Sequence, residues 1–135
     1  MRRILTILLL LMTLTSCSLQ EVASYLHKPV SKVTPTEVWF VTVWYERAKL
    51  HDQPFLKCTR AHESDSAGSY AAYNGSGPYY GAYQFLQNTW DNTTRSMGRT
   101  DLVHAAITRV PWWDQDAVAW WLYQRSGNGP WGGRC

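Results

Sequence analysis

The order of apolar and polar residues divides the chain into segments with different expected structures. The first is a largely apolar run from Ile4 to Leu14, directly after Arg2 and Arg3. A stable transmembrane helix needs about 20 apolar residues, so this run is too short to span a bilayer. A basic start, a short apolar run and then small residues are typical of a secretory signal peptide. We therefore predict a signal peptide over residues 1–16 and exclude it from the fold.

The next two segments differ in pattern. Residues 17–36 mix Ser, Thr, Lys and two prolines without a clear period, and we interpret them as a tether. Residues 37–51 fit two templates, because the β-branched run in "EVWFVTVWYERAKL" suits a strand as well as a helix. We choose a lead-in helix capped by Thr36, since helical spacing relates Trp39, Val43, Arg47 and Leu50.

The folded domain is predicted over residues 52–135. It opens with a helix in which Asp52 is the expected N-cap and Pro54 lies in the first turn. Phe55, Cys58 and His62 share one stripe of this helix, and Glu63 falls at its far end, just before "SDSAGS".

The middle of the domain changes from turn chemistry to helical patterns. "YAAYNGSGPYYGAY" (70–83) contains "NG" and "SGP", which predicts a short irregular hairpin with many tyrosines. "QFLQNTW" (84–90) predicts a return to helix, and Thr100 or Asp101 is the expected cap of a short helix through Ile107.

The last helix is predicted in "PWWDQDAVAWWLYQRSG". Asp114 is its expected N-cap and Gly127 its terminator. The residues expected on its buried face are Ala117, Val118, Trp121 and Leu122. We expect an extended tail from there to Cys135.

Composition adds limits on partners. Charged residues make up 17% of the chain and the net charge is +3, which gives little reason to expect a nucleic-acid partner. Eight Trp and eight Tyr are the unusual feature. These side chains combine an apolar face with a polar atom, which suits sugars and interfaces, although an aromatic core would use them too.

The chain has three cysteines, and an odd number in an exported protein leaves at least one cysteine outside any internal disulfide. "LTSC" resembles the lipobox of bacterial lipoproteins, and this resemblance implies cleavage before Cys17 and a diacylglyceryl group on its thiol. Ordinary secretion with cleavage nearby is the alternative. If Cys17 is lipidated, Cys58 and Cys135 remain, and an exported chain permits a disulfide between them. The four histidines are scattered, and we predict no metal site and no cofactor.

Glu63 is the candidate catalytic residue. A carboxylate at the C-terminal end of a helix meets the negative end of the helix dipole. This position disfavours the charged form and raises the pKa, as a general acid requires.

Four motifs, "FLKCTRAHES", "YYGAYQFLQNTWD", "DQDAVAWWLYQ" and "GPWGGRC", give residues 52–135 a resemblance to the resuscitation-promoting factors of high-GC Gram-positive bacteria. This resemblance implies a small lysozyme-like α+β fold that is mostly helical and cleaves peptidoglycan between MurNAc and GlcNAc. It implies that Glu63 is the catalytic acid and that Cys58 and Cys135 pair. More loosely, it places the glycan groove among Tyr80, Tyr83, Gln84 and Trp90.

The loop after Glu63 departs from the family pattern. Members commonly read E-S-x-G-N-(W/Y), whereas "ESDSAGSY" places Tyr70 seven residues after Glu63. The loop is two residues longer, so the role of Tyr70 and the register of the hairpin are left open.

Four functions remain open from the sequence. A single glutamate fits a lytic transglycosylase, which uses the sugar's own 6-hydroxyl, better than a hydrolase, which usually needs two carboxylates. The candidates for a second carboxylate are Asp65, Asp91, Asp101, Asp114 and Asp116. A glycan-binding module without catalysis and a structural lipoprotein are the rivals from other classes. We expect a monomer that binds peptidoglycan glycan strands, is anchored to the membrane through lipid on Cys17, and lies at the outer face of the cytoplasmic membrane.

Overall fold

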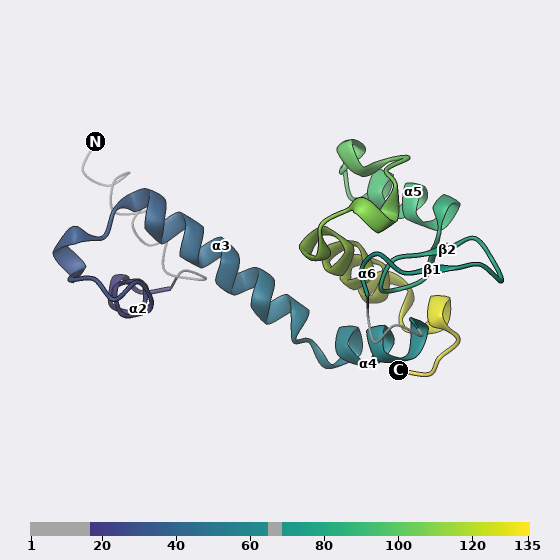
Figure 1. The fold of residues 1–135 in the computed structure, drawn as a ribbon, viewed down its shortest axis with the longest axis horizontal. Coiled ribbons are helices and arrows are strands. Elements are labelled where there is room, and N and C mark those ends of the chain that lie inside the picture. The colour runs from purple at the N-terminus through teal and green to yellow at the C-terminus, as the bar shows by residue number, and fades with distance from the viewer. Residues whose placement is uncertain (1–16, 65–68) are drawn as a thin grey trace. The chain divides into compact units, whose positions relative to one another are not determined.

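The computed structural model describes residues 17–64 and 69–135. The chain divides into two compact units, unit 1 (Met1–Ala48) and unit 2 (Lys49–Cys135). The described residues contain five α-helices, namely α2 (Leu19–Tyr25), α3 (Pro35–His51), α4 (Pro54–Glu63), α5 (Gln87–Ser96) and α6 (Trp112–Ser126) (Figure 1). They also contain three strands, β1 (Tyr73–Asn74), β2 (Tyr79–Tyr80) and β3 (Phe85–Leu86), in one antiparallel sheet of order β1-β2-β3. The predicted class, a mostly helical α+β fold, is confirmed.

Unit 1 is more regular than the predicted tether. Helix α2 begins with a capping box in which the Ser18 hydroxyl accepts from the Glu21 N–H and the Glu21 carboxylate accepts from the Ser18 N–H. The tether interpretation expected no helix here. The sequence did carry a signal for one, since Ser-x-x-Glu is the signature of this box. A short 3₁₀ turn, η1 (Val30–Lys32), follows.

Helix α3 confirms the predicted lead-in helix but corrects its cap. The capping hydroxyl belongs to Thr34, which accepts from the Glu37 N–H at 3.3 Å, while the Glu37 carboxylate accepts from the Thr34 N–H at 2.9 Å. Thr36 lies inside the first turn, after Pro35. The hydrogen bond from Lys28 and those from Thr34 lower the pKa of Glu37 to about 2.

Helix α4 confirms the predicted helix with Pro54 as its first residue and Glu63 as its last. The N-cap residue is Gln53 rather than Asp52, and its side chain makes no capping hydrogen bond. Asp52 instead forms an exposed ion pair with Lys57 at 3.7 Å. The buried face of α4 consists of Phe55, Leu56, Thr59 and Arg60.

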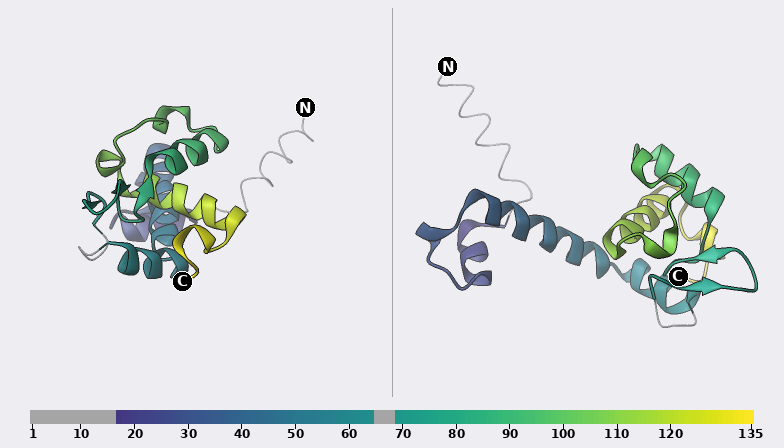
Figure 2. Two further views of the ribbon diagram at one scale, coloured as in Figure 1. Left: turned by 90° about the vertical axis from the view of Figure 1, so that its right-hand side faces the viewer. Right: turned by 45° about the horizontal axis from the view of Figure 1, so that its top comes forward.

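The tyrosine-rich segment forms the predicted hairpin from β1 and β2, which extends beyond the helices at one side of unit 2 (Figure 2). The helix expected over residues 84–90 is only partly correct. Phe85 and Leu86 pair with β2 as strand β3, and α5 begins at Gln87. At Gly81, where φ is +75°, a Cβ would lie 2.3 Å from the side-chain oxygen of Gln115, so only glycine fits beside this buried amide.

The segment after α5 replaces the predicted short helix with two 3₁₀ turns, η2 (Thr100–Leu102) and η3 (Ile107–Arg109). Neither Thr100 nor Asp101 is a cap, because Asp101 pairs with Arg99 at 2.8 Å. The same arginine binds Asp114 at 2.9 Å.

Helix α6 lies between α4 and α5 in unit 2 (Figure 1). Its N-cap residue is Pro111 and not Asp114, whereas Gly127 ends the helix as predicted. Its buried residues are Gln115, Asp116, Val118 and Ala119, so only Val118 of the predicted buried face is fully buried. The ring of Trp121 lies under Arg125 at 3.9 Å instead. The tail is not fully extended, because Gly129–Trp131 forms a 3₁₀ turn, η4.

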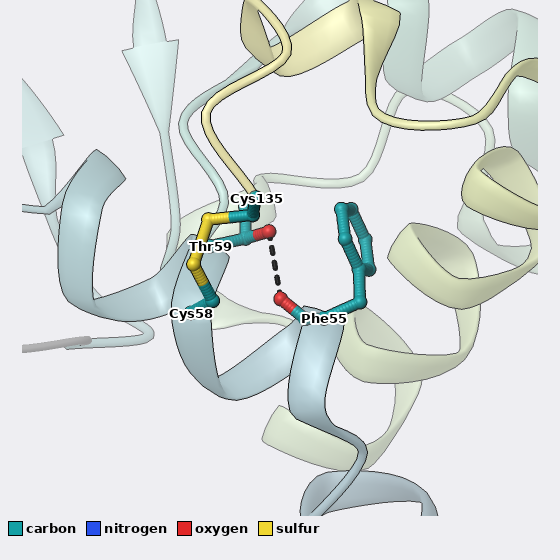
Figure 3. Close-up of a disulfide and its surroundings, with 4 residues drawn as sticks. All are labelled: Phe55, Cys58, Thr59 and Cys135. Atoms are coloured by element: carbon teal, nitrogen blue, oxygen red, sulfur yellow. Dashed lines mark hydrogen bonds between the residues drawn. A yellow bond between two sulfur atoms is a disulfide. The ribbon is translucent and has the colours of Figure 1, made fainter.

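A disulfide joins Cys58 on α4 to Cys135 at the end of the tail (Figure 3), as the resemblance implied. The sequence separation is 77 residues, for which the chain-entropy account gives a stabilisation of about 4 kcal/mol. Phe55, three residues before Cys58, stacks on Tyr123 and contacts the edge of Trp131, so the covalent link adjoins the aromatic core.

Across residues 17–64 and 69–135, none of the helices combines the length and the apolar character needed to cross a membrane.

Candidate active site around Glu63

Glu63 is positioned by the helix that it ends. Helix α4 is held on one face by its buried side chains and on another by the disulfide of Cys58, five residues before Glu63. The C-cap residue Ser64 is buried, and its hydroxyl lies 3.4 Å from the Arg60 carbonyl oxygen. The packing of α4 and the disulfide therefore hold the backbone of Glu63 in place.

Two hollows meet at Glu63. The first has a volume of about 350 Å³ and the second about 460 Å³, within the usual range for ligand sites. Glu63, Asn74 and Gln84 line both hollows. The rest of the first hollow is lined by Tyr79 and by four residues of the tail, Pro130, Trp131, Gly132 and Arg134. The rest of the second hollow is lined by His62, Ser64, Ala72, Tyr73 and Gly75. Because the two hollows share Glu63, Asn74 and Gln84, we refer to them together as the groove.

Burial raises the pKa of the Glu63 carboxyl above its ordinary value. The positive charge of Arg134 and, to a smaller extent, His62 act in the opposite direction and lower this pKa. Burial is the larger cause, so the acid keeps its proton to a higher pH than an exposed glutamate would. The sequence predicted a raised pKa for Glu63 from the helix dipole. In the structure, the main cause of the raised pKa is burial.

Gln84 lines both hollows together with Glu63. Its φ is +50°, a backbone conformation that non-glycine residues seldom adopt. Its side-chain N–H donates to the Gly81 carbonyl at 2.9 Å. This hydrogen bond sets the orientation of the amide, with the nitrogen toward Gly81 and the oxygen on the other side. The other end, Oε1, is buried and has no hydrogen-bond partner among residues 17–64 and 69–135. A hydroxyl or an amide N–H of a ligand would satisfy this acceptor once the side chains around it move to expose it.

The other predicted groove residues lie elsewhere. Trp90 is fully buried and donates its indole N–H to the Leu102 carbonyl at 2.8 Å, so it belongs to the core. Tyr83 is also fully buried, and Tyr80 packs against the core and stacks on Tyr73. Direct contact of Trp90 with a ligand would need it to leave the core, whereas Tyr83 lines a smaller hollow that also includes Tyr79 and Gln84.

The tyrosines that do line the groove are Tyr73 and Tyr79, whose exposed fractions are 62% and 39%. Asn74 and Arg134 also line it and were missed. Asn74 was interpreted only as turn chemistry. Arg134 carried a usable signal, because a residue next to the disulfide partner of Cys58 must lie near Glu63.

The aspartates considered as second carboxylates are engaged away from this groove. Asp91 binds His104 and Gln87, while Asp101 and Asp114 bind Arg99. Asp116 is fully buried in unit 2. Asp65 lies outside the described residues. Among the described residues, Glu63 is the one carboxylate in the linings of the two hollows.

Asp116 lies at the centre of a buried network. Its carboxylate accepts from the hydroxyls of Tyr70 at 2.6 Å and Tyr83 at 2.5 Å, pairs with Arg60 at 3.5 Å, and contacts the ring nitrogen of His51 at 2.9 Å. Burial and this carboxylate raise the pKa of both tyrosines. The network joins the last residue of α3 (His51), α4 (Arg60), α6 (Asp116) and the hairpin region (Tyr70 and Tyr83). It therefore helps to hold α4 and the hairpin, which line the groove, in place.

Cys58, His62 and Cys135 bring their side-chain ligand atoms within 4.8 Å of one another, one turn of α4 separating Cys58 from His62. The sequence analysis missed this spacing. Because the two sulfurs are joined in a disulfide, they are not thiolates, which is the form that binds metals.

Replacing Arg134 with Gln is expected to raise the pKa of Glu63 further, because a nearby positive charge that favours the carboxylate is removed. We expect an upward shift of this pKa, seen by carboxyl-carbon NMR titration of Glu63. Arg125→Gln, on the exposed end of α6, is the matched control and should leave the titration unchanged. An unchanged or lowered pKa in Arg134→Gln would show that Arg134 does not act on Glu63.

Comparison of the chain with protein-family models, with curated proteins and with solved structures gave no match in any of the three.

Proposed function

We propose that unit 2 is a lysozyme-like domain that cleaves the glycan strands of peptidoglycan between MurNAc and GlcNAc as a lytic transglycosylase. The observation that carries this proposal is Glu63, a carboxyl group whose pKa is raised by burial and which lines both hollows of a groove with tyrosine and amide walls. Such a groove offers stacking faces and hydrogen bonds, which sugars need. The resemblance of residues 52–135 to the resuscitation-promoting factors supports the same substrate.

In the proposed reaction, protonated Glu63 donates its proton to the glycosidic oxygen, and the bond to C1 of MurNAc breaks. The N-acetyl group of the substrate stabilises the positive charge that develops at C1. The Glu63 carboxylate then removes the proton of the C6 hydroxyl, whose oxygen bonds to C1 to give the 1,6-anhydro sugar. Glu63 regains its proton, and no water is consumed. The absence of a second carboxylate from the described linings favours this scheme over hydrolysis.

The proposed location is the outer face of the cytoplasmic membrane, with the chain anchored by lipid on Cys17. A disulfide is consistent with an exported protein, since thiols in the cytosol are kept reduced.

The test is a digest of purified peptidoglycan by the wild-type protein, with products identified by mass spectrometry. We expect 1,6-anhydro muropeptides, which are lighter by one water than hydrolysis products. Reducing-end muropeptides would replace the proposal with a hydrolase and direct the search for a second carboxylate to Asp65. Sedimentation with the glycan but no cleavage would replace it with a binding module.

A further inference from the structure

Unit 1 has an apolar groove that the proposed catalysis does not use. Its volume is about 650 Å³, and it lies between α2, the η1 region and the first half of α3. The apolar side chains that line it are those of Leu19, Val33, Pro35, Val38, Trp39 and Val43.

Unit 1 exposes several large aromatic side chains, of which Trp39 lines this groove, whereas Phe40 and Tyr45 do not. Trp39 and Phe40 are 65% and 64% exposed, and Tyr45 is 56% exposed. Leu19, on the groove, is half exposed. The apolar groove, with the exposed Trp39 and Leu19 in its lining, therefore marks an interaction surface.

The position of the groove along the chain indicates what covers it. Leu19 lies two residues after Cys17, and the apolar run Ile4–Leu14 lies just before it. If Cys17 carries lipid, as the lipobox resemblance implies, the acyl chains are attached two residues before the groove-lining Leu19. Trp and Tyr are also the residues that concentrate at the interface between lipid and water.

The charges of unit 1 limit the kind of attraction. Residues 17–48 carry three carboxylates and three basic side chains, which are Glu21, Glu37, Glu46, Lys28, Lys32 and Arg47. Lys28 and Glu37 are paired with each other. A surface without net charge is not drawn to anionic lipid by electrostatics, so apolar contact must dominate.

We propose that the apolar groove of unit 1, with Trp39 in its lining, docks onto the surface of a phospholipid bilayer. Trp39 enters the interfacial region, and the groove takes up acyl chains. Docking supplies a second, non-covalent attachment beside the one expected at Cys17, as stable membrane anchoring generally requires.

The experiment uses the expected mature protein, residues 17–135, with Cys17→Ser in every sample, so that neither the apolar run Ile4–Leu14 nor an acyl group is present. The vesicles are of zwitterionic phosphatidylcholine with brominated acyl chains. Bromine quenches the fluorescence of tryptophans that reach the bilayer. We expect Trp39→Phe to reduce the quenched part of the fluorescence, whereas Trp120→Phe, in the core-packed face of α6, should not. Equal quenching in wild type and Trp39→Phe would overturn the proposal.

A second pair of variants measures the strength of docking. Trp39→Ser should lower the vesicle partition coefficient about tenfold, since one large apolar side chain no longer leaves water. Tyr73→Ser removes an aromatic ring of similar exposure from unit 2 and should have no such effect. An equal loss in both variants would overturn the proposal. So would a lipid-free dimer in sedimentation that Trp39→Ser dissociates, because a second copy would then cover the groove.

Discussion

Glu63→Gln is expected to reduce the rate of glycan cleavage by about 10²–10⁴-fold, the usual contribution of a general acid. Glutamine keeps the size of the side chain and its place at the end of α4, but it has no proton to donate at any relevant pH. Since the tyrosines, Asn74 and Gln84 of the groove are unchanged, binding of glycan should stay within a few-fold of wild type. The measurements are the initial rate of muropeptide release and co-sedimentation with peptidoglycan.

The matched control is Glu46→Gln, which makes the same change at an exposed position of α3 and should leave the rate unchanged. Cleavage that survives Glu63→Gln would assign the acid to another residue. Loss of binding together with cleavage would give Glu63 a structural role instead.

The stability of Glu63→Gln separates these outcomes. Because the folded-state pKa of Glu63 is raised, its charged form destabilises the folded state above that pKa, and the penalty disappears as the pH falls through it. The variant should therefore be at least as stable as wild type at neutral pH and lose this advantage in acid. A marked loss of stability at neutral pH would show that the effect on activity comes from unfolding.

Asp116→Ala is expected to destabilise the protein by about 3–5 kcal/mol, as breaking a buried ion pair does. The substitution leaves the Arg60 side chain, only 9% exposed, without its carboxylate. It also removes the acceptor of the Tyr83 hydroxyl, and a buried hydroxyl left unpaired costs about 1–3 kcal/mol. The Tyr70 hydroxyl loses the same acceptor but keeps the ring nitrogen of His51 at 3.1 Å. The measurement is the free energy of unfolding in urea.

Asp114→Ala, two residues earlier on the same helix, is the matched control. Asp114 binds the partly exposed Arg99, and such pairs contribute about 1 kcal/mol or less. Asp116→Asn should fall between the two, because the amide oxygen still accepts one hydroxyl but carries no charge for Arg60. A loss in Asp116→Ala no larger than in Asp114→Ala would show that the network is not important for stability.

The elements that the sequence predicted correctly are those with local causes. Pro54 fits only the first turn of a helix, and glycine at position 127 ends α6 because it takes a positive φ. The "NG" and "SGP" pairs place a turn between β1 and β2. Such signals act within a few residues, so the pattern along the chain is enough to locate them, and Glu63 at the end of α4 was found in this way.

The tertiary structure alone decided which of several similar side chains form the groove. Four tyrosines of the hairpin region look alike in the sequence, namely Tyr73, Tyr79, Tyr80 and Tyr83. Of these, only Tyr73 and Tyr79 line the groove. Tyr83 is buried, and its hydroxyl is hydrogen-bonded to Arg60 and Asp116. Those partners are 23 and 33 residues away along the chain. In the same way, Arg134 reaches the groove because a disulfide holds the tail beside α4. Burial and pairing are set by contacts between distant segments, and neither the hydrophobic period nor turn chemistry contains that information.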